Sequence, residues 1–222
     1  MISLSNAVVF GWHSAIMGMR NPMNSWAKSD SVFYSDFSCK IGQNDLDLMK
    51  TLIKAGTEHR KFLRMIHVQM DIEAPLYWWK EFETYKIGTV SNSCSTMHKI
   101  HEKEFTIDDF SHEHLIVSDN VNHIDMVAWL QEQIDVLNEW RRTFLDVKNS
   151  DVSSESAKRY WWQMIQLLPS SYNQLRTVDL NYEVLLNQYF QRKEHKLDEW
   201  RIYCEQIKCF PYLNDFIEVL EK

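Results

Sequence analysis

The sequence predicts an α+β fold in which helices pack on a mixed sheet and outnumber the strands. Two stretches, residues 64–73 and 176–180, alternate between apolar and polar side chains, which is typical of half-buried strands. Elsewhere apolar residues recur at helical spacing, most clearly in residues 121–147. Because the two strands lie far apart in the chain, we expect a sheet assembled from separate segments, with helices packed on it.

The N-terminal part contains one predicted loop and one predicted helix. Residues 20–38 are rich in Asn, Ser and Asp, which indicates a long ordered loop or a set of turns. A short helix follows, for which Asn44 or Asp45 can serve as the N-cap and Gly56 can mark the end.

The strand at 64–73 leads into a second predicted helix. Pro75 stands where a missing backbone N–H costs nothing, so we expect it to start a helix over residues 75–86. The small and polar residues 87–97 then predict a loop.

Histidine and acidic residues are concentrated in the segment 98–123. The helical pattern of 121–147 follows, and residues 149–154 (NSDVSS) indicate a break with a cap for the next helix. That helix is expected to stop at Pro169, because the residue before a proline disfavours the helical conformation.

The C-terminal part is predicted to be mainly helical. After the strand at 176–180, we expect helices at about 182–192 and 195–208. Pro211 allows a short closing helix.

Length and charge set further bounds. A chain of 222 residues suits one domain, so we predict a single α+β domain over residues 1–222 with a helical insertion at about 98–150. The net charge of -7 argues against a generally basic surface, and we expect no nucleic-acid partner. The five glycines form neither a GxGxxG nor a GxxxxGK[ST] pattern, so side chains and helix ends would have to hold the phosphates of any bound nucleotide or flavin.

Targeting and redox signals are also informative. Residues 1–12 have no basic segment followed by a long apolar core, and no stretch is long enough to span a bilayer. The four cysteines match neither a zinc pair nor a disulfide framework. We therefore expect a cytoplasmic protein with reduced thiols and no membrane partner.

Two segments carry a recognisable pattern. The first, residues 67–95 (HVQMDIEAPLYWWKEFETYKIGTVSNSCS), joins a strand, a proline-started helix and a small-residue loop. The second, residues 167–201, places Pro169, Asn181, Asn187 and Arg192 along a Leu-Pro, strand and Asn-led helix sequence. Together they resemble a divergent branch of the flavin-dependent thymidylate synthase family, which lacks the family's intact Arg-His-Arg signature. The resemblance implies the fold of thymidylate synthase-complementing proteins.

The resemblance also implies roles for individual residues. Glu81 falls where the family has a glutamine, Thr84-Tyr85-Lys86 fall on Arg-His-Arg, and Cys94 or Ser95 falls on the second serine of the loop. The residues implied to bind substrate are Glu81, Thr84, Ser91, Cys94, Ser95 and Arg192, and those implied to bind cofactor are His67, Tyr85, Lys86, Ile87, Asn181 and Asn187. No protein nucleophile is required, so none is assigned.

By this resemblance, the protein would transfer a one-carbon unit from methylenetetrahydrofolate to dUMP, giving dTMP. FAD would be the cofactor, NADPH and methylenetetrahydrofolate would be co-substrates, a pyrimidine deoxynucleotide would be the ligand, and the chain would form a homotetramer. The loss of Arg-His-Arg removes two guanidinium groups that bind phosphate in a bidentate manner, and Lys86 is not an equivalent donor array. A catalytically inactive or repurposed relative, acting as a nucleotide-binding or protein-interaction module, is therefore an open alternative.

Several of these residues also have purely structural interpretations. Asn181 can cap a helix, Arg192 can pair with a nearby glutamate, and Cys94 can be a plain loop thiol. A weaker alternative is a metal-dependent enzyme that uses the histidine-rich segment 98–123, but neither HxxxxH nor HExxH spacing occurs there, and we assign no metal ligand.

Overall fold

The computed structural model describes residues 1–35, 37–118, 123–150 and 154–221. These residues form two compact units. Unit 1 comprises residue 1, residues 73–80 and residues 93–175, and unit 2 comprises residues 2–72, 81–92 and 176–221. The single domain with an insertion at about 98–150 stays a prediction.

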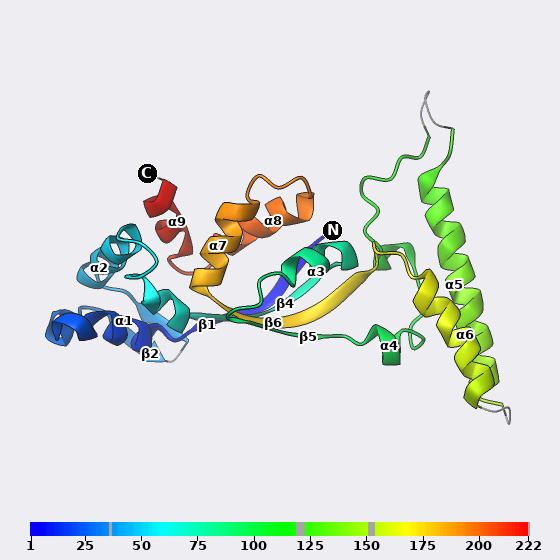
Figure 1. The fold of residues 1–222 in the computed structure, drawn as a ribbon, viewed down its shortest axis with the longest axis horizontal. Coiled ribbons are helices and arrows are strands. Elements are labelled where there is room, and N and C mark those ends of the chain that lie inside the picture. The colour runs from blue at the N-terminus through cyan, green and yellow to red at the C-terminus, as the bar shows by residue number, and fades with distance from the viewer. Residues whose placement is uncertain (36, 119–122, 151–153, 222) are drawn as a thin grey trace. The chain divides into compact units, whose positions relative to one another are not determined.

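A four-stranded sheet has the order β1-β4-β6-β5 (Figure 1). Its strands are β1 (Ser3–Phe10), β4 (His67–Pro75), β5 (Thr89–Ser93) and β6 (Asn173–Asn181). Helices outnumber strands among the described residues, so the predicted helix-rich α+β class is confirmed.

The two predicted strands are present and follow the predicted alternation. In β4 the side chains of Val68, Met70 and Ile72 are buried, because every second residue of a strand faces the same side. In β6 Val178 and Leu180 are buried in the same way. β4 begins and ends later than the predicted 64–73, and β6 extends beyond both ends of the predicted 176–180. Residues 61–65 form a 3-10 turn (Lys61–Met65) before β4.

Four strands and the first helix of the chain were not predicted. Besides β1 and β5, a two-stranded antiparallel sheet pairs β2 (Val32–Ser35) with β3 (Ser38–Lys40), and α1 covers Trp12–Arg20. The predictions of a loop at 87–97 and of turns throughout 20–38 were therefore wrong in part. The missed strands are largely exposed, so their sequences show no alternation of apolar and polar residues.

The helix α2 (Gln43–Lys54) begins differently from the prediction. Its N-cap is Gly42, which has no side chain to cap with, so the expected cap by Asn44 or Asp45 was wrong. Instead Asp30 accepts hydrogen bonds from the backbone N–H groups of Asn44 (2.9 Å) and Asp45 (3.1 Å). Asp45 is fully buried and pairs with Arg20 at 2.6 Å. The predicted end at Gly56 is confirmed, since Gly56 follows the C-cap and has φ 108.

The helix after β4 is shorter than predicted. Pro75 closes the strand, and α3 covers Leu76–Phe82 rather than residues 75–86. Beyond it, the backbone N–H groups of Thr84 and Tyr85 bond to the carbonyl groups of Glu81 (3.1 Å) and Phe82 (3.0 Å). These bonds turn the chain into the loop that leads to β5.

Unit 2 closes with the three predicted C-terminal helices. They are α7 (Tyr182–Arg192), α8 (Asp198–Ile207) and α9 (Leu213–Glu221). Their apolar faces bury large side chains, among them Tyr182, Trp200 and Phe216. This burial fixes the positions of α7 and α8 within the unit, since interiors are densely packed.

Unit 1 is built around α5 (Met126–Lys148) and α6 (Ser154–Leu167), which pack against each other (Figure 1). Asp125 caps α5 by accepting from the backbone N–H of Val127 and Ala128. The predicted start near residue 121 and part of the predicted break at 149–154 lie outside the described residues. The short helix α4 (Thr96–Lys99) and a 3-10 turn at Ile107–Asp109 complete the unit.

The core of unit 1 is apolar and aromatic. Buried residues from the loops and from both long helices form it: Ile100, Phe105, Phe110, Leu130, Ile134, Leu137, Phe144, Ala157 and Met164. Within the described part of the chain, every helix is too short or too polar to traverse a bilayer.

Candidate functional site

The end of α3 meets α7 and α8 in a cluster of polar and aromatic side chains within unit 2. Arg192, the last residue of α7, donates from Nη1 to Glu81 Oε2 at 2.7 Å and from Nε to the Tyr85 hydroxyl at 2.9 Å. The Trp200 indole N–H donates to the same Glu81 oxygen at 3.2 Å. His195 Nε2 lies 3.2 Å from that oxygen as well.

The cluster holds Arg192 in place on several sides. Its guanidinium carbon lies 4.9 Å from the centre of the Trp200 ring and 5.7 Å from that of Tyr85, so both rings add cation–π attraction. The Arg192 side chain is 19% exposed and that of Glu81 is 34% exposed. Glu81 therefore neutralises the Arg192 guanidinium, which by the resemblance would bind the nucleotide.

Asn181 has the structural role that its position at a helix start suggested. Its side chain accepts from the backbone N–H of Val184 at 3.1 Å, which caps α7, and the residue is 7% exposed. Gly88 runs directly against it: a Cβ built on Gly88 would lie 2.6 Å from Asn181 Nδ2, and Gly88 has φ 76. Only glycine fits this approach without strain, so the loop after α3 is fixed against the start of α7.

A cleft of about 420 Å³ opens beside this cluster within unit 2. The loop after α3 lines one side and α7 lines the other. Its residues are Thr84, Tyr85, Lys86, Ile87, Val184, Asn187 and Gln191. Five of the residues predicted to bind substrate or cofactor are thus brought together, and Arg192 is joined to them through Tyr85.

The donors in this cleft suit a ligand that carries phosphate. Lys86 is exposed and charged, the amide of Asn187 is half-buried, and Gln191 accepts from the Tyr85 hydroxyl at 2.9 Å. Nearby, the Thr89 hydroxyl is buried without a hydrogen-bond partner among the described residues. Since pockets for small molecules span roughly 300–1,000 Å³, a cleft of this volume would enclose one half of a dinucleotide rather than the whole.

Two other predicted residues lie elsewhere in unit 2. His67 Nδ1 is 2.9 Å from Asp179 Oδ1, and its ring stacks on Phe10 with centroids 5.6 Å apart. His67 does not line the cleft beside Arg192. Ser91 lies on β5 and is exposed, and it does not line the cleft beside Arg192.

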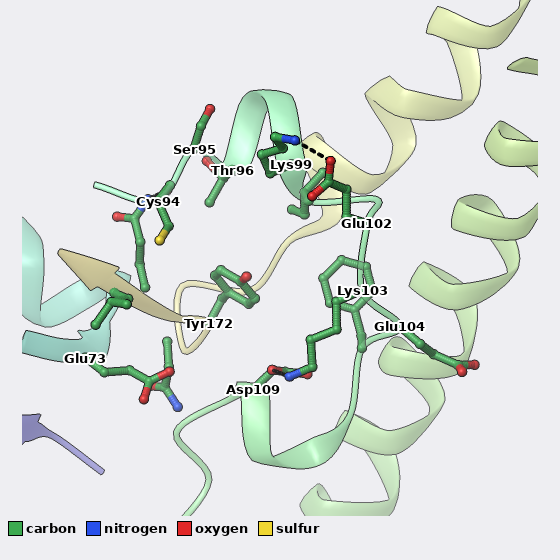
Figure 2. Close-up of a pocket in the computed structure, with 15 residues that line it drawn as sticks. Glu73, Cys94, Ser95, Thr96, Lys99, Glu102, Lys103, Glu104, Asp109 and Tyr172 are labelled. Carbon is green, nitrogen blue, oxygen red and sulfur yellow. Dashed lines mark hydrogen bonds and ion pairs between the residues drawn. The ribbon is translucent and has the colours of Figure 1, made fainter. Parts of the chain in front are cut away.

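Cys94 and Ser95 belong to unit 1, where they line a separate cavity of about 330 Å³ (Figure 2). Figure 2 shows them at one side of this cavity, with Lys103, Asp109 and Tyr172 among its other walls. Gln174 donates to the Cys94 carbonyl at 2.9 Å, and Ser95 caps α4 through the backbone N–H of His98 at 3.1 Å. The structure thus gives Ser95 a local structural role.

The lysines of this second cavity are already paired with carboxylates. Lys103 bonds to Asp109 at 2.6 Å, and Lys99 bonds to Glu102, as the dashed line in Figure 2 marks. Burial alone would raise the pKa of Asp109, but the bonds from Lys103 and Thr106 outweigh it and hold that pKa below its usual value. Burial raises the pKa of the Tyr172 hydroxyl. This cavity therefore offers an incoming anion little net positive charge.

Sequence reasoning missed two members of the Arg192 cluster, His195 and Trp200. His195 follows Arg192 by one turn and donates its backbone N–H to the Arg192 carbonyl at 2.9 Å, so it necessarily lies close. A predicted turn after α7 was the available signal for His195. Trp200 had none, since its place over Arg192 depends on how α8 packs.

The histidine-rich segment 98–123 does not assemble a metal site in the described residues. No group of three or more His, Cys, Asp or Glu side chains is placed there, or elsewhere in the part of the chain that the structure covers, to hold a metal ion. The metal-dependent alternative gains no support from this arrangement.

The fold is similar to those of three solved structures. A flavin-dependent thymidylate synthase from Helicobacter pylori, complexed with FAD and dUMP, matches with a TM-score of 0.63 and 15% identity over 96% of this chain and 97% of that one. A second structure of the Helicobacter pylori enzyme with FAD and dUMP matches with a TM-score of 0.60 and 16% identity, over 100% of this chain and 99% of that one. A UMP/dUMP methylase from Streptomyces cacaoi, bound with 5-Br dUMP, matches with a TM-score of 0.56 and 12% identity, over 94% of this chain and 88% of that one.

Sequence comparison gives no corresponding match. No protein-family model and no curated protein sequence matches the chain. The likeness to the solved structures therefore shows a shared fold, and it confirms the fold that the two sequence segments implied.

Proposed function

We propose that this protein binds a pyrimidine deoxynucleotide and a flavin, and that it transfers a one-carbon group to the nucleotide as the flavin-dependent thymidylate synthases do. The observation that carries the proposal is the gathering of Tyr85, Lys86 and Asn187 in one cleft of unit 2, with Arg192 bonded to Tyr85. The fold in which they gather is that of a Helicobacter pylori enzyme whose structures hold FAD and dUMP.

Each residue has a role in this proposal. Lys86 and Asn187 would donate to phosphate oxygens of FAD, with Ile87 and Asn181 beside them, and His67 would contact the cofactor from β4. Arg192 would bind the nucleotide, with Thr84 at the same cleft and Glu81 as the competing partner of its guanidinium. Bound flavin would supply the redox chemistry, with NADPH and methylenetetrahydrofolate as co-substrates and dUMP as the acceptor. The protein's own contribution is to position and orient the ligands.

We also propose that the chain forms a homotetramer, as the resemblance implies. Mass measured by light scattering tests this point. A tetramer is the expected result, and a monomer at micromolar concentration would contradict it.

A second candidate is a repurposed relative that binds a nucleotide or a protein partner without catalysis. Two observations favour it. Thr84-Tyr85-Lys86 replace the Arg-His-Arg signature, and Arg192 is engaged by Glu81 at 2.7 Å instead of standing free for a phosphate.

The first experiment is the visible absorption spectrum of the purified protein before and after addition of FAD and removal of the excess. Retained bands of oxidised flavin would support the flavin site, and formation of dTMP from dUMP with NADPH and methylenetetrahydrofolate would then test catalysis. A protein that retains no flavin would refute the first candidate. Binding of dUMP by that protein would then support the second.

A further inference from the structure

A third pocket lies in unit 1, formed by α4, α5, α6 and the residues that follow α4. Its volume is about 370 Å³. The lining residues are Met97, His98, His101, Phe144, Lys148, Ala157, Lys158 and Trp161. None of them belongs to the proposed flavin or nucleotide site.

The ionisable side chains that line this pocket are all basic. Two lysines and two histidines line it and no acidic residue does, although the whole chain carries a net charge of -7. Glu102 is the nearby carboxylate that acts on His101, and it is engaged by Lys99. Lys158 makes no ion pair within the part of the chain that the structure describes. The pocket thus keeps positive charge that the described residues of unit 1 do not neutralise.

The His101 ring carries an N–H donor that has no acceptor among the described residues. Lys148 Nζ lies 3.2 Å from His101 Nε2, and since an ammonium can only donate, Nε2 accepts and the ring proton sits on Nδ1. His101 Nδ1 is buried without a partner among the described residues. Burial and the positive charge of Lys148 hold the pKa of His101 below its usual value, which favours this neutral form. A buried N–H without an acceptor is costly, so an acceptor atom from a ligand would stabilise it.

The floor of the pocket is apolar and partly aromatic. Phe144 is 8% exposed and Ala157 is 5% exposed. The Trp161 indole N–H donates to the Met97 carbonyl at 3.0 Å, which fixes the ring between α6 and α4. The His101 ring meets Phe144 edge-on with centroids 4.8 Å apart, and Lys148 lies 5.5 Å from the centre of the Phe144 ring. Aromatic rings and lysine side chains thus line one small cavity.

We propose that this pocket binds a small organic anion with a planar aromatic body, of the aromatic carboxylate class. The carboxylate takes its charge partners from Lys148 and Lys158 and accepts from His101 Nδ1, and the ring packs against Phe144 and Trp161. The volume suits one small molecule rather than a polymer or a lipid surface. This proposal does not depend on the proposed binding of flavin and nucleotide.

The test uses 2-naphthoate as the probe and its neutral amide, 2-naphthamide, as the isosteric control. Calorimetry on the full chain should show naphthoate binding at least about tenfold tighter than naphthamide, the scale of one charged hydrogen bond. Lys148→Met and Lys158→Met keep the apolar stems of the side chains and should each weaken naphthoate binding by about tenfold. Lys61→Met, on an exposed lysine of unit 2, should leave it unchanged.

A second readout separates a binding site from a merely structural pocket. The ring of His101 is faced by Lys148 and Arg141 of α5, by Lys99 and Glu102, and by the lysine and histidine that share the pocket, Lys158 and His98. A bound anion offsets the repulsion from the lysines and Arg141, so naphthoate should raise the pKa of His101 measured by NMR, and naphthamide should not.

The proposal is overturned if millimolar naphthoate does not bind, if naphthamide binds equally well, or if both lysine variants, folded by circular dichroism, bind naphthoate like the unmodified protein. An unchanged His101 pKa in the presence of saturating naphthoate would also overturn it, because the anion would then lie elsewhere.

Discussion

The substitution Glu81→Gln should release Arg192 for an anionic ligand. In the structure, Glu81 Oε2 receives Arg192 at 2.7 Å and Trp200 at 3.2 Å. Glutamine keeps a carbonyl oxygen that can accept both bonds, but it removes the negative charge. The guanidinium would then be oriented by its neighbours without being neutralised by them.

The magnitude follows from the partial exposure of the pair. Fully exposed ion pairs contribute about 0.2–1 kcal/mol, and breaking a buried pair costs about 3–5 kcal/mol. With side chains 19% and 34% exposed, the pair lies between these limits. Because glutamine preserves the hydrogen bonds, we expect Glu81→Gln to lower the free energy of unfolding by only about 1 kcal/mol. A freed guanidinium that bonds to a phosphate should gain about 1.5–3 kcal/mol, a ten- to hundredfold tighter dissociation constant for dUMP.

The assay is calorimetric titration with dUMP and with deoxyuridine, which lacks the phosphate. Tighter binding of dUMP alone is expected, and the gain should vanish in Glu81→Gln combined with Arg192→Ala. Glu83→Gln is the matched control, since it changes the same charge two residues away, where Glu83 pairs with Arg176 at 2.6 Å. Equal gains for dUMP and deoxyuridine, or no gain in a folded variant, would refute the view that Glu81 blocks Arg192.

Three further predictions concern stability. Asn181→Ala should cost about 1 kcal/mol of unfolding free energy through loss of the α7 cap, whereas Asn181→Ser should retain the cap. A serine variant that keeps its stability but no longer retains flavin would identify a ligand role for the Asn181 amide. Gly88→Ala should cost about 1–2 kcal/mol in urea unfolding, because φ 76 disfavours a side chain and the Cβ would meet Asn181; an unchanged urea midpoint would show that the loop relaxes freely. Asp45→Asn should cost about 3–5 kcal/mol, because it leaves Arg20 buried and unpaired. Burial opposes ionisation of Asp45, but hydrogen bonds from Ser31, Ser29 and Arg20 outweigh it and lower the pKa of Asp45. The stability that the ionised Asp45 contributes is therefore present above the ordinary carboxyl pKa and is lost as the pH falls through the lowered pKa. Urea midpoints measured from neutral to acid pH should accordingly fall less steeply in Asp45→Asn than in the unmodified protein.

The strands and helices with one buried face could be predicted from the sequence. β4 and β6 show a clear alternation, and α5 shows a clear apolar stripe, because in each case one face is buried and the other is exposed. The same reasoning failed for β1, β5 and the hairpin of β2 and β3. Their residues are mostly exposed, and hydrogen bonds to neighbouring strands, which leave no trace in hydrophobic patterning, define them.

Parts of the candidate site were also accessible from the sequence. The spacing of Asn181, Asn187 and Arg192 along one predicted helix placed them on successive turns, and α7 carries all three at its start, middle and end. Tyr85 and Lys86 were predicted at the end of a helix and Ile87 at the start of a loop, whereas the structure places all three in the loop after α3, where they line the same cleft. Their roles toward FAD and dUMP stay predictions.

The sequence by itself determined which segments fold locally, because helical and strand periodicities and helix caps act over a few residues. Only the tertiary structure decided which charges meet. Glu81 and Arg192 are separated by 111 positions, and His101 and Lys148 by 47, so no local pattern encodes either contact. Packing of the end of α3 against α7 sets the Glu81 carboxylate beside Arg192, and packing of α5 and α6 leaves a lysine-lined pocket with no carboxylate among its lining residues. The physical reason is that electrostatic interactions depend on distance in space and on burial, which the chain acquires only when it folds.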